Sequence, residues 1–250
     1  MTRPVRTRPP PCSDALWEAA AAVLDALRKP EVCGPNMVAF LIGSSACKLF
    51  CDHVLPYSPN YRAPNDIDVV VCTHLAQEEV KEQLAAAQEN IHLVPSKTPG
   101  MNYRVLRYGS KGTVGPNGGY SKLIKIDVLV ATRTLGIPSI PAHRVYWIAG
   151  RWPVAPLEFL ILLRLQGWDD HKHSPLEHHR EKMMTDVGDL AGHLVPFVLK
   201  AWDGLSEGGT SLWAEAKSYL ADEFIAKSHV RAEAFVRDHP WARSDWERLG

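Results

Sequence analysis

Two apolar segments that carry aspartates constrain this chain more than any other feature of its sequence. The first segment spans Met37 to Val71 and contains two apolar runs. One run ends in Gly43-Ser44-Ser45, and the other carries Asp66 and Asp68. A short helix and a loop are expected between them. The later segment, KLIKIDVLV, carries Asp127. Runs of this composition are typical of buried strands, and a protein core does not accept carboxylates without compensation.

The spacing of the aspartates predicts that their side chains converge. Asp66 and Asp68 are two residues apart, so on a strand they share one face and Ile67 takes the other. Their Cα atoms would lie roughly 6.5–7 Å apart. Such carboxylates suit a hard divalent cation, and a third, Asp127, would allow two ions about 3.5–4 Å apart, as used in phosphoryl displacement. A lone aspartate could simply cap a loop, but three beside Ile, Val or Leu favour a metal site.

The turn Gly43-Ser44-Ser45 is consistent with the same interpretation. Glycine permits a tight strand-to-helix turn and close approach of a ligand, and Ser44 or Ser45 can N-cap the helix that follows. A helix N-terminus is an anion site, here for a triphosphate; a plain serine cap is the alternative. Lys125 shares a face with Asp127 and either offsets charge there, contacts phosphate, or forms an ordinary ion pair.

Gly43-Ser44, Asp66-Ile67-Asp68 and Ile126-Asp127-Val128 together resemble the nucleotidyltransferase superfamily, the DNA polymerase beta-like fold, and within it the minimal and abortive-infection-toxin type. The resemblance covers roughly residues 37–190, with a longer, proline-containing segment before Asp66 than compact members have. It implies that Gly43, Ser44 and Ser45 hold nucleotide phosphates and that the three acids hold Mg²⁺ or Mn²⁺. It also gives Asp127 a second possible role, activation of the acceptor.

The resemblance implies an enzyme that moves a nucleoside monophosphate from an NTP, such as ATP, to an acceptor hydroxyl and releases pyrophosphate. The acceptor stays open between RNA, a protein and a small molecule, since a fold does not choose it. Two alternatives remain. One is a non-catalytic nucleotide- or protein-binding module on the same scaffold, and the other is a plain α/β protein whose acids cap loops.

Charge is unevenly distributed along the 250 residues, although the net charge is zero. A net charge of zero argues against a general nucleic-acid coat protein. Residues 100–151 carry eight Lys and Arg against one acid, whereas residues 152–250 carry eleven basic and sixteen acidic residues. A basic middle segment beside carboxylates indicates an anionic substrate. The alternative is a set of solvated lysines and arginines on strand edges.

Cysteine usage and hydropathy indicate a cytoplasmic protein. The five cysteines are odd in number and lack metal-finger spacing, and no signal peptide is recognisable, which together favour free thiols in a reducing compartment. The apolar runs are too short or too interrupted to span a bilayer, so no membrane partner is expected.

The expected architecture is α/β (α+β), with a mixed nucleotidyltransferase-type sheet and flanking helices over residues 13–155 and a helical region over 156–250. Residues 1–12 form a disordered basic tail in this interpretation. A helix starts at Ser13 and ends before Pro30, and another, capped by Thr73, covers about 75–90. Strands are expected at 37–42, 66–72, 91–94, 102–108 and 120–130, with a hairpin over 144–154.

Two further groups are weaker candidates. Four histidines at positions 171, 173, 178 and 179 suggest zinc, but we discount this because a loop and adjacent helix positions do not converge readily and no cysteine is near. Arg164, Lys182 and Asp186 loosely resemble a feature of abortive-infection-type nucleotidyltransferases. They either orient a phosphate or acceptor or simply bridge two helices, and we favour the bridge.

Overall fold

The computed structural model describes residues 14–34, 37–54, 61–96, 103–109, 123–131, 136–203 and 211–250. The tail 1–12 and most of the glycine-rich loop after Tyr108 lie outside these residues. Contacts between residues divide the chain into two compact units, residues 1–48 with 60–129, and residues 49–59 with 130–250. The predicted α/β class, a mixed sheet with flanking helices followed by a helical C-terminal region, is confirmed.

The first unit contains five strands in the order β3-β4-β5-β2-β1. Their bounds are β1 Val38–Ile42, β2 Asp66–Cys72, β3 Ile91–Pro95, β4 Arg104–Tyr108 and β5 Ile124–Val130. The pairs β1–β2, β3–β4 and β4–β5 are antiparallel. Valine and isoleucine fill these strands because branched side chains pack well on a pleated surface. The strands predicted from the sequence are therefore present, with ends shifted by a few residues.

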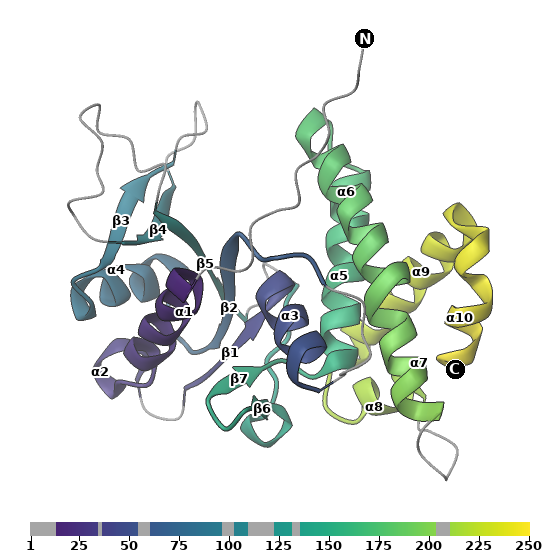
Figure 1. Ribbon diagram of the computed structural model, residues 1–250, viewed down its shortest axis with the longest axis horizontal. Coiled ribbons are helices and arrows are strands. Elements are labelled where there is room, and N and C mark those ends of the chain that lie inside the picture. Colours follow the sequence, from purple (N-terminus) through teal and green to yellow (C-terminus); the bar gives the residue numbers. More distant parts are fainter. Residues whose placement is uncertain are drawn as a thin grey trace. The chain divides into compact units, whose positions relative to one another are not determined.

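Helices cover one face of this sheet. Helix α1 (Asp14–Leu27) contacts β1 and β2, while α4 (Gln77–Ala87) contacts β3 and β4, and the two helices lie side by side with the short α2 (Pro30–Cys33) against α4 (Figure 1). The apolar stripe of α1 is buried, as its helical periodicity predicts. Helix α3 (Gly43–His53) follows β1 directly.

The predicted cap of α4 is wrong. The Thr73 hydroxyl accepts a hydrogen bond from the backbone N–H of Leu75 at 3.3 Å, which closes a local turn before the helix. The helix starts at Gln77, with Ala76 at the N-cap, and the Glu79 carboxylate accepts from the Ala76 N–H at 2.7 Å. A side chain that satisfies a turn delays the helix, because it offers the backbone a competing hydrogen bond.

The second unit is mainly helical. It contains the hairpin β6 (Tyr146–Ile148) and β7 (Trp152–Val154), which turns through Ala149 and Gly150 at positive φ, as predicted. Its helices are α5 Leu157–Lys172, α6 Glu177–Asp189, α7 Val195–Asp203, α8 Leu212–Lys217, α9 Asp222–Asp238 and α10 Arg243–Arg248, with a π-helical turn at Leu190–Leu194 and 3₁₀ turns at Ala142–Arg144 and Pro240–Ala242. Among the described residues, no helix has the length and apolar character needed to cross a bilayer.

Candidate metal and nucleotide site

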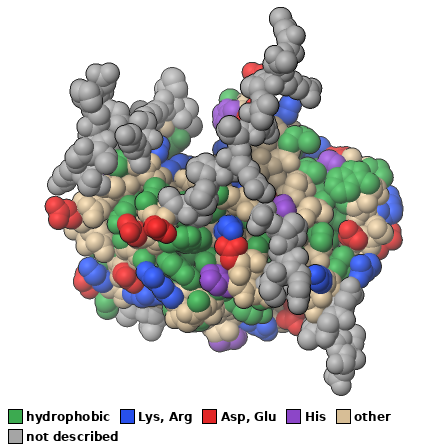
Figure 2. All heavy atoms as spheres, viewed as in Figure 1, with side chains coloured by type: hydrophobic (Ala, Val, Ile, Leu, Met, Phe, Trp, Pro, Cys, Tyr) green, Lys and Arg blue, Asp and Glu red, His purple; other side chains and the backbone are tan. Residues whose placement is uncertain are grey.

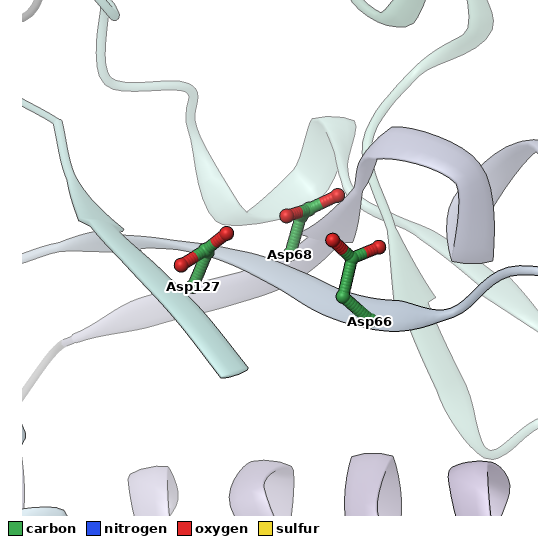
Figure 3. A group of neighbouring side chains, drawn as sticks. All are labelled: Asp66, Asp68 and Asp127. Atoms are coloured by element: carbon green, nitrogen blue, oxygen red, sulfur yellow. The ribbon is translucent and has the colours of Figure 1, made fainter. Parts of the chain in front are cut away.

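The three predicted aspartates meet on one face of the first unit's sheet. Asp66 and Asp68 come from β2 and Asp127 from the neighbouring strand β5. One oxygen from each carboxylate lies within 4.8 Å of the others, and all three residues are half-buried (Figure 3). This is the only group of this kind that the described residues contain. We call the sheet face that carries Asp66, Asp68 and Asp127 the carboxylate face.

Strand alternation explains how the sequence builds this group. Ile67 between the two β2 acids is fully buried, and Ile126 and Val128 on either side of Asp127 are each 1% exposed. These apolar side chains anchor the strands in the core and leave the aspartates on the opposite face. The pairing of β2 with β5 then brings the two sets of acids together.

Gly43 allows the chain to turn tightly against Asp68. Ile42 is the register partner of Asp68, and Gly43 follows it with a φ of +63°, a value that L-residues other than glycine rarely adopt. A Cβ atom built on Gly43 would lie 2.0 Å from Oδ2 of Asp68. Glycine is therefore required here both by the backbone conformation and by the space that the carboxylate occupies.

The two serines lie in the first turn of α3. The helix begins at Gly43, so Ser44 and Ser45 are inside it and neither is the N-cap that was predicted. Both are buried, and the Ser45 hydroxyl donates to the carbonyl of Ile42 at 3.2 Å. The first backbone N–H groups of a helix have no intrahelical acceptor. The turn thus offers donors and a positive dipole end beside Asp68.

Lys125 is a cation that pairs directly with one of the three acids. Its Nζ donates a hydrogen bond to Oδ2 of Asp127 and forms an ion pair with it. Partial burial lowers the pKa of Lys125, but the fields of Asp127, Asp66 and Asp68 outweigh that effect and raise the pKa above its ordinary value. The ammonium of Lys125 thus pairs with one of the three carboxylates, Asp127. An all-oxygen, negatively charged set fits Mg²⁺ or Mn²⁺ better than a soft metal.

Arg104 is held by acidic residues of a neighbouring helix. Arg104, on the opposite face of β4, pairs with Glu82 and Glu78 of α4, and the Lys81 ammonium donates to the Arg104 carbonyl at 3.0 Å. Figure 2 shows acidic and basic side chains next to one another at the left of the view, where the first unit lies. Arg104 is therefore paired within its own unit and is not a free cation of the basic middle segment.

Arg164 bridges two helices of the second unit, as preferred from the sequence. From α5 it contacts Asp186 at 2.8 Å and Asp189 at 3.3 Å, both on α6. His171 approaches Asp186 with Nδ1 at 2.6 Å, and its ring contacts that of His179. Lys182 is exposed. These groups form a helix-to-helix contact within the second unit.

One residue on the carboxylate face, Arg107, was not singled out by the sequence. Pairing of β4 with β5 sets Arg107 directly opposite Lys125. Alternation along NYRVLRY separates Arg107 from Arg104, so the two arginines could have been assigned to different faces. Which face meets the acids depends on strand register, which the sequence alone does not give.

Comparisons with known proteins show similarity at the level of the fold. No family model matches the chain, and no curated protein matches it. Among solved structures, an antigenic nucleotidyltransferase-like protein from Paracoccidioides brasiliensis is 15% identical with a TM-score of 0.54, over 96% of this chain and 95% of that one. The chain therefore has a nucleotidyltransferase-like fold.

A second solved structure, the antibiotic-resistance factor ANT(2'')-Ia, is 15% identical with a TM-score of 0.37, over 76% of this chain and 92% of that one. At that score the likeness carries no argument about this chain.

Proposed function

We propose that this protein is a metal-dependent nucleotidyltransferase. The observation that carries the proposal is the convergence of Asp66, Asp68 and Asp127 within 4.8 Å, beside the first turn of α3. A nucleotidyltransferase-like fold supports it. The abortive-infection-toxin type, a preference for ATP, and a place in the cytoplasm remain predictions.

Each residue has a role in this proposal. The first turn of α3, with Gly43, Ser44 and Ser45, binds the triphosphate of the NTP through backbone N–H groups. Asp66, Asp68 and Asp127 hold Mg²⁺ or Mn²⁺, which when bound would neutralise phosphate charge and lower the pKa of the acceptor hydroxyl. Lys125 contacts phosphate or limits the repulsion among the acids.

The bonds that change are those of a phosphoryl substitution. The acceptor oxygen bonds to the α-phosphorus of the NTP, and the bond from that phosphorus to the pyrophosphate oxygen breaks. The hydroxyl proton passes to the carboxylate of Asp127, which faces the other two acids (Figure 3). Pyrophosphate leaves with the electrons of the broken bond.

A thermal-shift scan tests the proposal. Wild type and the double variant Asp66→Ala/Asp68→Ala are melted with each NTP, with and without Mg²⁺. A ligand at 100 times its dissociation constant adds about 2.7 kcal/mol of stability, so the wild type should show a clear Mg²⁺-dependent shift that the double variant lacks. Asp25→Ala, which removes an exposed carboxylate of α1, is the control and should keep the shift.

The remaining outcomes separate the alternatives. A Mg²⁺-dependent shift without pyrophosphate release, across RNA, protein and small-molecule acceptors, would favour a non-catalytic binding module. If no NTP gives a shift, the proposal is contradicted. The result would then favour the plain α/β protein whose acids cap loops.

A further inference from the structure

We propose that the part of the carboxylate face formed by β4 and β5 binds phosphate groups of a single-stranded nucleic acid, and that the terminal hydroxyl of this strand is the acceptor. The proposal rests on the function proposed above and names the acceptor class that was left open there. It is carried by Arg107 and Lys125, which we call the cationic pair.

The strand register places the cationic pair beside the acids. Arg107 and Lys125 are directly opposite each other in the antiparallel β4–β5 ladder, so their side chains leave the same face of the sheet about 5 Å apart at Cβ. Lys125 and Asp127 are two residues apart on β5 and share that face as well. The cationic pair therefore lies on the carboxylate face, next to Asp127.

Arg107 has no carboxylate partner among the described residues. Its Nη1 donates a hydrogen bond to the carbonyl of Leu123 at 3.3 Å, and the residue is half-buried. Arg104, three residues earlier and on the opposite face, has two acidic partners on α4. A half-buried guanidinium without an acid retains donors for an anion, and its planar fork matches phosphate.

The adjoining strand adds no negative charge to this part of the face. His92 on β3 is the register partner of Arg107, and Nε2 of its ring lies 2.8 Å from the carbonyl of Gly109. Val94 is the partner of Val105 on the same face. On β3 and β4 the register partners His92, Val94, Val105 and Arg107 thus bring no carboxylate to this face, which favours an anionic acceptor and disfavours a cationic one.

The order of the strands indicates that the cationic pair contacts the acceptor, and not the triphosphate of the NTP. Helix α3 begins against Asp68 on the β1 side of β2, and the triphosphate is proposed to bind there. Strands β5 and β4 lie on the other side of β2. The cationic pair is therefore across the acids from the first turn of α3. An acceptor hydroxyl at Asp127 would have the rest of its molecule over Lys125 and Arg107.

Two adjacent cations match a chain of phosphates better than a single one. In the proposed complex, the 3′-terminal hydroxyl of the strand lies at Asp127 and the phosphates that precede it contact Lys125 and Arg107. The oxygen of that hydroxyl then forms the bond to the α-phosphorus of the NTP, with loss of pyrophosphate and transfer of the proton to Asp127.

The test measures binding of a short, fluorescently labelled single-stranded RNA oligonucleotide to the full chain by fluorescence anisotropy, at several salt concentrations. Arg107→Gln should weaken binding about tenfold and reduce the slope of log affinity against log salt by about 0.7, the value for one lost phosphate contact on a single strand. Arg107→Lys should retain most of the slope. Arg104→Gln, the matched control on the other face, should bind within about twofold of wild type.

Four results would overturn the inference, three of which come from the binding experiment. They are a wild type that does not bind the oligonucleotide, an Arg107→Gln variant with unchanged affinity and slope, and a nucleoside monophosphate that competes with the oligonucleotide at equal concentration. A loss of the Mg²⁺-dependent NTP shift in Arg107→Gln would also overturn it, because Arg107 would then serve the donor nucleotide. Melting of each variant without ligand controls for unfolding.

The experiments distinguish a failure of the proposed function from a failure of the proposed acceptor. If the wild type shows no NTP shift with Mg²⁺, the nucleotidyltransferase proposal fails whatever the oligonucleotide does. If the NTP shift is present and depends on Asp66 and Asp68 while the oligonucleotide fails to bind, only the acceptor class is wrong.

Discussion

Two groups of aspartates among the described residues differ in burial. Asp186 and Asp189 in the second unit are each 2% exposed, and Arg164 contacts both, with His171 against Asp186. The cluster of Asp66, Asp68 and Asp127 in the first unit is half-exposed, and Lys125 pairs with one of its members. The first group is buried and paired within its own unit, whereas the second is half-exposed.

This difference separates a structural role from a binding role. Carboxylates that are fully buried must be paired, because an uncompensated buried charge is costly. Carboxylates that converge at a half-exposed position gain stability when a cation from solution binds between them. Converging acids at a half-exposed position are therefore a stronger indication of a metal site than converging acids that are buried and paired.

The largest predicted effect compares the two cations. Arg164→Met leaves two buried carboxylates without their guanidinium, and the free energy of unfolding should fall by about 3–5 kcal/mol. Lys125→Met removes a partner from a pair that is 40% and 33% exposed, and should cost about 0–1 kcal/mol. Urea unfolding measures both. If the two variants lose the same free energy of unfolding, the two groups of aspartates do not differ in how strongly they depend on their cation.

A second prediction compares two glycines that both have positive φ. Gly43→Ala introduces strain of about 1–3 kcal/mol and a Cβ at the position of the Asp68 carboxylate, so it should also lose the Mg²⁺-dependent thermal shift. Gly150, at φ +65° in the β6–β7 turn, has no atom within 4 Å of an added Cβ. Gly150→Ala should show the strain alone and keep the shift, and a normal shift in Gly43→Ala would contradict our placement of the metal.

The smallest predicted effect concerns Glu158, a half-buried acid whose hydrogen-bond partner, Tyr219, is neutral. Desolvation raises the pKa of Glu158 above its ordinary value and the field of Glu215 adds to the rise, while the hydroxyl that Tyr219 donates at 3.0 Å and the field of Arg144 oppose it. The native state then retains a proton that the unfolded chain loses. Stability is full below the unfolded pKa and falls as pH rises through the folded value.

Glu158→Gln should remove this contribution. Its unfolding free energy, compared with that of wild type across acidic to neutral pH, should decline less as pH rises, by an amount smaller than the effect of Gly43→Ala. A wild type whose stability rises relative to Glu158→Gln over that interval would reverse the sign of the pKa shift.

Local patterns predicted much of the fold and the positions of the acids. The valine- and isoleucine-rich runs predicted β1, β2 and β5, and alternation placed Asp66, Asp68 and Asp127 opposite buried residues, because both features depend on neighbours in sequence. The start of α4 was misplaced because a threonine turn and a helix cap use the same hydroxyl. The juxtaposition of Arg107 and Lys125 was not predictable, since register depends on residues distant in sequence.

The contact between Gly43 and Asp68 has a consequence for the history of this chain. A side chain at position 43 and a carboxylate at position 68 require the same volume, so neither position can change freely while the other is kept. Among related sequences the two positions should therefore vary together. A relative with a larger residue at the position of Gly43 is expected to have lost the acid as well, which makes one glycine a marker of whether the site has survived.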